Sequence, residues 1–191
     1  MVMISREEAH KMVTELVENK NLIKHMYCVE ACLEDYAERL GQNKEVWGIA
    51  GLLHDADWEK FPDEHPRELV KRLKEMNEKT PGYVPSEIIS AIAGHGNGEP
   101  RFEKRTSLLD HYLYACDEIS GFVIACALLN PEKLDGVKVS SVIKRLKDKS
   151  FARGVNREDI QEGIEEIGVP LEEHVQNVIN SLLRIKTELG F

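Results

Sequence analysis

The sequence predicts an all-α fold, arranged as a helical bundle in a single domain. Apolar residues recur every three or four positions through several long segments, residues that start and stop helices bracket those segments, and no segment shows the alternation of a strand. With 191 residues, 42% of them hydrophobic, the chain is long enough for one well-buried core and short for two. We expect one domain over 1–191, with a core at about 20–130 and a helical extension at about 131–191.

The first two helices have recognisable ends. Ser5 and Glu8 form the Ser-x-x-Glu pattern of a capping box, which predicts a helix over 5–18. Apolar residues then follow a helical period over 22–40, and Gly41 stands where a left-handed residue commonly ends a helix. We expect this second helix to be a central element of the core.

Asparagine and proline mark the helices that follow. Asn43 can cap a helix that ends near His54, and His65-Pro66 begins another, because proline fits the first turn. Pro85 opens a short helix that ends in Gly94-His95-Gly96, where glycines permit a tight turn and a close approach of the backbone. The remaining helices are expected at 107–129, 140–149, 156–167 and 170–189.

The charge balance is acidic, with 34 acidic and 25 basic residues and a net charge of -9. This argues against nucleic acid or an anionic membrane as a general partner, and leaves a homo-oligomer open. The chain has no run of about eighteen apolar residues and no N-terminal signal-peptide region, so we expect a cytoplasmic protein without a membrane span. Cysteines inside helical patterns are expected to be reduced core thiols. They are Cys28, Cys32, Cys116 and Cys126.

A histidine and an aspartate, His54 and Asp55, stand side by side at the end of an apolar helical run. Neighbouring residues on a helix point about 100° apart, so these two side chains can hold one ion from two sides. The alternative is an ordinary helix end, in which the pair caps the helix, forms a salt bridge or faces solvent.

Two further residues of ligand type, His25 and Asp117, lie on apolar helix faces. An ionised carboxylate among apolar residues is costly unless it is paired or bound to a cation. The alternatives are a hydrogen-bonded core histidine at His25 and a salt bridge from Asp117 to a lysine or arginine. We discount a thiolate site at His25, Cys28 and Cys32, because such sites need more cysteines at tight spacing.

In chain order these residues read H...HD...D, which resembles the HD-domain superfamily of metal-dependent phosphohydrolases, and the small bacterial HD hydrolases in particular. The resemblance runs from about His25 to Leu128, with one similar segment beyond it. The segments are LIKHMYCVEACLEDYAERLG, WGIAGLLHDADWEKF, YACDEISGFVIACAL and KVSSVIKRLKDKSFARGVNRE. The resemblance implies an all-helical core around a divalent ion held by His25, His54, Asp55 and Asp117. Two nitrogens and two carboxylates suit Mn, Fe, Ni, Co, Zn or Mg better than Cu(I).

Some members of the superfamily bind a second ion through histidines between the HD pair and the last aspartate. His65 and His95 match those positions and are candidates for a second metal or for substrate phosphate. The sequence departs from the fuller pattern, because no histidine adjoins His95 and the HDIG motif reads HDAD, which leaves one ion or two open. Asp57 can orient a ligand histidine or cap the next turn, and the sequence favours neither.

The function that follows is metal-dependent hydrolysis of a phosphomonoester or phosphodiester, with nucleotides among the candidates. Asp55 is expected to be catalytic, because it can hold the metal and orient its water. Two alternatives remain. One is a di-iron oxygenase on the same fold, which His65 and His95 would permit, and the other is a metal-stabilised binding or regulatory module without turnover.

A phosphorylated substrate also calls for a positive group near the metal, because an acidic chain repels it at long range. Segment 138–157 contains seven positive residues and one negative residue, a net charge of +6. The alternative is a solvated helix face. The candidate phosphate ligands in this segment are Lys144, Lys147, Arg153 and Arg157.

Overall fold

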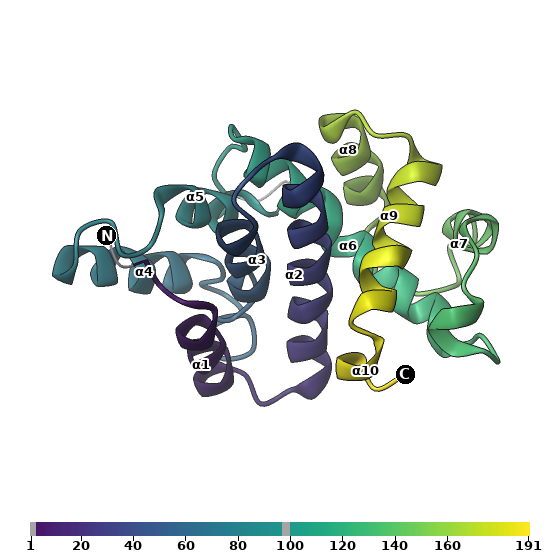
Figure 1. Ribbon diagram of the computed structural model, residues 1–191, viewed down its shortest axis with the longest axis horizontal. Coiled ribbons are helices and arrows are strands. Elements are labelled where there is room, and N and C mark those ends of the chain that lie inside the picture. The colour runs from purple at the N-terminus through teal and green to yellow at the C-terminus, as the bar shows by residue number, and fades with distance from the viewer. Residues whose placement is uncertain (1–2, 97–99) are drawn as a thin grey trace.

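The computed structural model describes residues 3–96 and 100–191, and every regular element in those ranges is a helix, which confirms the predicted all-α fold (Figure 1). The helices are α1 (Arg6–Leu16), α2 (Lys20–Leu40), α3 (Lys44–Leu53), α4 (Arg67–Lys79), α5 (Ser86–Gly94), α6 (Leu108–Leu128), a 3-10 helix (Lys133–Gly136), α7 (Val139–Leu146), α8 (Arg157–Ile167), α9 (Leu171–Arg184) and α10 (Lys186–Leu189). None of the described helices is long and apolar enough to cross a membrane.

The predicted caps are present. Ser5 and Glu8 form the capping box at the start of α1, Gly41 ends α2 with φ 65°, and the side chain of Asn43 accepts the first N–H groups of α3. The structure differs from the prediction at two places. It contains a 3-10 helix that the sequence did not predict. The single helix expected over 170–189 is two helices, because Ile185 leaves helical geometry at φ -109° and ψ 18°.

α2 is the central helix. Figure 1 shows α1, α3, α4 and α5 on one side of it and α7, α8 and α9 on the other. α3 lies close against α2 at Gly51, where an added Cβ would fall 2.7 Å from the backbone nitrogen and 2.9 Å from the Cα of Glu30. Only glycine permits this approach, which brings the C-terminal end of α3 next to α2.

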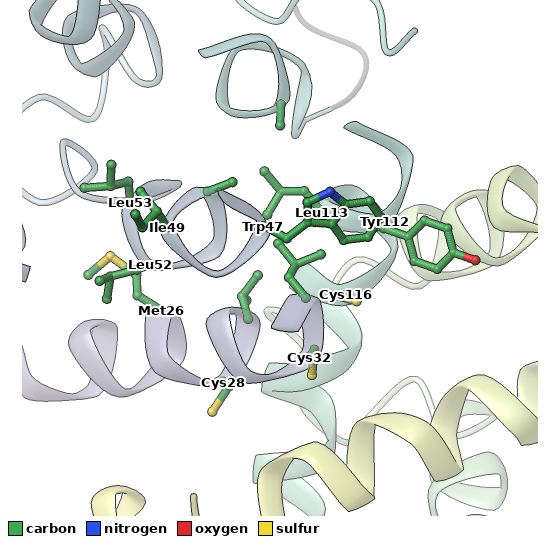
Figure 2. Close-up of a cluster of buried hydrophobic side chains, with 14 of the residues drawn as sticks. Met26, Cys28, Cys32, Trp47, Ile49, Leu52, Leu53, Tyr112, Leu113 and Cys116 are labelled. Atoms are coloured by element: carbon green, nitrogen blue, oxygen red, sulfur yellow. The ribbon is translucent and has the colours of Figure 1, made fainter. Parts of the chain in front are cut away.

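Buried apolar side chains fill the space around this contact. Figure 2 shows Met26 of α2 near Leu52 in the last turn of α3. It also shows Trp47 beside α6, where its ring centroid lies 5.6 Å from that of Tyr112. The four cysteines are buried and carry free thiols, as predicted.

A buried polar network joins α9 to α2 and α6. His174 donates through Nε2 to the carbonyl of Ala115 at 2.9 Å, since a carbonyl can only accept. Its Nδ1 therefore accepts from the Tyr36 hydroxyl at 2.6 Å, and Asn177 donates to the same hydroxyl oxygen at 3.2 Å. The network fixes the C-terminal helices on the core that carries the ligand-type residues.

Replacing Gly51 by Ala should destabilise the protein. Alanine is the better helix former by about 1 kcal/mol, but its Cβ would overlap the Glu30 backbone, which cannot rotate away as a side chain can. We expect the free energy of unfolding of the metal-free protein to fall by about 1–3 kcal/mol in urea titrations. Gly154→Ala is the matched control, because a Cβ there meets nothing within 4 Å. Equal stability of the two variants would contradict the close approach.

His174 should make the fold sensitive to acid. Burial lowers the pKa of His174 below its ordinary value of 6.5, although the hydrogen bond to Ala115 opposes this. Below pH 6.5 His174 of the unfolded chain takes up a proton that the folded chain does not. The free energy of unfolding therefore falls as the pH drops from 7 to 5. His174→Gln should remove up to about 1.4 kcal/mol per pH unit from this slope. Unfolding titrations at three pH values measure it, and identical slopes in the two proteins would count against the assignment.

Candidate metal centre

Five separated parts of the fold deliver ligand-type side chains to one cleft of about 420 Å³. α2 and α6 supply one each from within a helix, and the ends of α3 and α5 and the turn before α4 supply the others. His54 lies beneath the cleft and is fully buried. The predicted ligand residues that line the cleft are His25, Asp55, His65, His95 and Asp117.

The first ligand set consists of His25, His54, Asp117 and the Oδ2 atom of Asp55. The Nε2 atom of His25 lies 2.9 Å from Oδ1 of Asp117 and 3.2 Å from Nε2 of His54. Oδ2 of Asp55 lies 3.6 Å from Nε2 of His54 and 3.8 Å from that of His25. The structure therefore brings the four predicted ligands into one cluster, and their role as ligands stays a prediction.

The second ligand set consists of His65, His95 and the Oδ1 atom of Asp55. The Nε2 atoms of the two histidines lie 3.0 Å apart, and each is 3.5 Å from Oδ1 of Asp55. Asp55 thus turns one oxygen toward each set. The two histidines come from different segments, and each was a candidate for a second metal from the sequence.

Three of the imidazoles have a defined tautomer, because each donates its Nδ1 hydrogen to a protein oxygen that can only accept. The pairs are His54 to the carbonyl of Gly51 at 2.8 Å, His65 to Oδ1 of Asp57 at 2.6 Å, and His95 to the carbonyl of Ile92 at 2.5 Å. Their Nε2 lone pairs then point at one another and at Asp55. Facing lone pairs and carboxylates at these distances repel unless a cation or proton lies between them, so the donor set fits a metal ion.

Asp57 combines the two roles that the sequence left open. Its Oδ1 atom orients His65, and its Oδ2 atom accepts the backbone N–H of Leu69 at 2.8 Å in the first turn of α4. The side chain is fully buried. One carboxylate therefore begins a helix and holds a ligand histidine at the same time.

The electrostatics of the cleft are dominated by the buried acids and imidazoles. Burial opposes charge on His54, but Asp55 and Asp117 outweigh it and raise its pKa to about 9. Burial alone would raise the pKa of the Asp55 carboxyl, but the imidazoles, His54 foremost, hold it below its usual range. Burial raises the pKa of Glu118 at the cleft wall to about 7, aided by Asp117. Without a cation, the cluster thus holds protons in its place.

Sequence reasoning missed the other walls of the cleft. Arg101 is the one lysine or arginine among its described lining residues, and its guanidinium lies 6.0 Å from the ring of Trp58 and 5.4 Å from that of Phe102. Tyr114 lies on another wall. Arg101 lies between helices, where no period marks which way a side chain points, so the sequence carried no signal for it.

The four basic candidates of segment 138–157 do not line the described part of the cleft, although Val155 and Asn156 of the same segment do. Lys144 borders a separate hollow with Cys126, and Figure 1 shows α7 on the opposite side of α2 from α5. The guanidinium of Arg157 donates to backbone carbonyls of its own loop, namely those of Leu146, Asp148, Phe151, Ala152 and Val155. Lys147 and Arg153 are also absent from the cleft walls. The phosphate-binding role of the four stays a prediction, and the described walls of the cleft do not support it.

Comparison with known proteins agrees with the geometry. The family model of the HD domain matches residues 22–121, a range that contains both ligand sets and covers more than half of the chain. No curated protein and no solved structure matches the chain. With the matched range, the helical fold and the clustered histidines and aspartates in agreement, the chain belongs to the HD domain family, whose superfamily comprises metal-dependent phosphohydrolases.

Proposed function

We propose that this protein is a phosphohydrolase that holds two divalent ions side by side. Its substrate would be a phosphate ester that binds in the cleft next to the two ions. The observation that carries the proposal is Asp55, whose two oxygens face two separate sets of imidazoles. A carboxylate shared in this way is suited to bridging two ions. Membership of the HD domain family supports the class of reaction.

The residues that would hold the ions are those of the two ligand sets, and their nitrogen and oxygen donors suit Mn, Fe, Ni, Co, Zn or Mg. Bound divalent ions lower the pKa of coordinated water and shield the charge of phosphoryl oxygens. Asp55 would orient the attacking water from its central position. Asp57 keeps the ring of His65 in one orientation, so the ligands need little rearrangement to act.

Arg101 would bind the substrate phosphate. It is the positive residue of an otherwise acidic cleft, whose described walls include Asp117, Glu118 and Asp159. Its Nη1 atom donates to the carbonyl of Pro62 at 2.8 Å, which fixes the side chain beside Trp58. A guanidinium held in this way can grip phosphate oxygens with two parallel hydrogen bonds.

The same paired ligand sets would also suit a di-iron oxygenase, the first alternative from the sequence. Iron content and oxygen uptake separate it from a hydrolase, since a hydrolase releases phosphate or an alcohol without consuming oxygen. A full complement of metal without turnover on a panel of phosphate esters would favour the regulatory module instead.

Metal content should follow the two ligand sets. We expect two Mn²⁺ or Co²⁺ ions per wild-type chain after equilibrium dialysis, one in His95→Ala, and fewer than one in Asp55→Ala, because Asp55 serves both sets. Removing the metal with a chelator should lower the unfolding temperature of the wild type. His10→Ala is the control, because His10 pairs with Tyr27 and belongs to neither set. Equal metal content in all four proteins would refute the assignment.

Arg101→Met should weaken binding of inorganic phosphate to the metal-loaded protein and raise KM for p-nitrophenyl phosphate by about tenfold, the effect of losing a charged hydrogen bond. The metal content should not change. The loss should be larger at low ionic strength, where screening is least. Lys144→Met removes the same charge from a different hollow and is the matched control. Phosphate affinity that is unchanged in Arg101→Met would rule out this role.

A further inference from the structure

Arg105 lies between α5 and α6 with only 9% of its side chain exposed, and its guanidinium contacts both the turn that carries His95 and helix α8. We propose that Arg105 is a positioning residue, which holds His95 in place for the second ligand set and ties that set to α8. The inference rests on the proposed two-ion function, because it adds a supporting residue to the second of the two ligand sets.

The contact with the turn is made on both sides of His95. Nη1 of Arg105 donates to the carbonyl of Gly94 at 3.2 Å and to that of Gly96 at 2.9 Å. The two carbonyls belong to the residues directly before and after the histidine. A single charged group therefore fixes the backbone on both sides of His95, while the carbonyl of Ile92 fixes its ring.

The glycines of the turn serve close packing. Neither Gly94 nor Gly96 has a positive φ. A Cβ at Gly94 would lie 3.2 Å from Cγ of Arg105, and a Cβ at Gly96 would collide with the ring of Phe102. The Phe102 ring also meets the His95 ring edge to face, with centroids 5.4 Å apart. The turn is thus held between the Arg105 side chain and the Phe102 ring.

The rest of the guanidinium is held from α8 and α6. Its Nε and Nη2 atoms donate to the two carboxylate oxygens of Glu166 at 2.8 and 2.7 Å, and its Cζ atom lies 3.6 Å from the ring centroid of Tyr114. Glu166 also accepts from Nδ1 of His111 at 2.6 Å. The planar fork of arginine is needed for this arrangement, because a lysine ammonium cannot bond a carboxylate with two parallel bonds and also reach two carbonyls.

Arg105 could instead serve only to attach α8 to the rest of the fold. Arg184 offers a matched comparison for that role. It bonds the carboxylates of Glu34 and Asp35 at 3.1 and 2.8 Å and the carbonyl of Ala31 at 3.0 Å, so it has the same kinds of partner, and it lines no part of the cleft. The two arginines make bonds of the same kinds, although Arg184 is the more exposed of the two, and of this pair only Arg105 touches the turn of a ligand.

The test compares Arg105→Met, Arg105→Lys, Glu166→Gln and Arg184→Met with the wild type, without using activity. In the metal-free proteins, the imidazole nitrogen NMR shifts of His95 report its tautomer. We expect Nδ1 of His95 to carry its hydrogen in the wild type and in Arg184→Met, and to lose it for part of the time in Arg105→Met. In Co²⁺ titrations followed by calorimetry and visible absorption, we expect the second ion to bind about tenfold more weakly in Arg105→Met, with the first unchanged. Arg105→Lys and Glu166→Gln should lie between these limits.

The outcomes separate the two proposals. The inference is overturned if Arg105→Met keeps the wild-type His95 spectrum and both Co²⁺ affinities and is only destabilised, as Arg184→Met is. Arg105 would then have a structural role alone. Wild-type protein that binds fewer than two Co²⁺ ions would overturn the two-ion function, and the His95 spectra would still decide the role of Arg105. If Arg105→Met does not fold, Arg105→Lys and Glu166→Gln decide by the same two measurements.

Discussion

The close contact of α2 and α3 sets the geometry on which the site depends. Gly51 can lie against the backbone of Glu30 because it has no side chain. Any other residue at this position would hold the two helices further apart. His25 stands a little over one turn before this contact on α2, and His54 follows it directly at the end of α3. Any separation of the helices would therefore part the two nitrogens that lie 3.2 Å from each other.

Around that contact, the same side chains that complete the fold also orient the ligands. Asp57 begins α4 and fixes His65, and backbone carbonyls at the ends of α3 and α5 fix His54 and His95. Buried polar groups need partners whether or not they have a function. Here the partners are arranged so that the remaining lone pairs converge, which explains why His54 and His95 lie at helix ends, where carbonyls are left unpaired by the helix itself.

The helices and the first ligand set could be predicted from the sequence because both follow from local patterns. Apolar periodicity gives the helices, and His25, His54 and Asp117 stand in or beside apolar stripes that must face one another in a small core. The rest depends on distances that a pattern does not contain. The resemblance named His65 and His95 as candidates, but not that they meet across two loops. Arg101 and Arg105 point inward from a segment without a period. The predicted role of the basic segment stays untested, because a charge count says nothing about direction, and the Arg157 guanidinium bonds carbonyls of its own loop.

The ligand-type residues extend from position 25 to position 117, so no short piece of the chain holds even one complete set. A site of this kind exists only in the fully folded chain, and an ion that binds it draws the folding equilibrium toward the native state by mass action. The fraction of chains that are open to proteases at any moment then depends on the supply of metal around them. Under the proposed function, metal scarcity lowers abundance as well as activity, and the two losses share one physical cause.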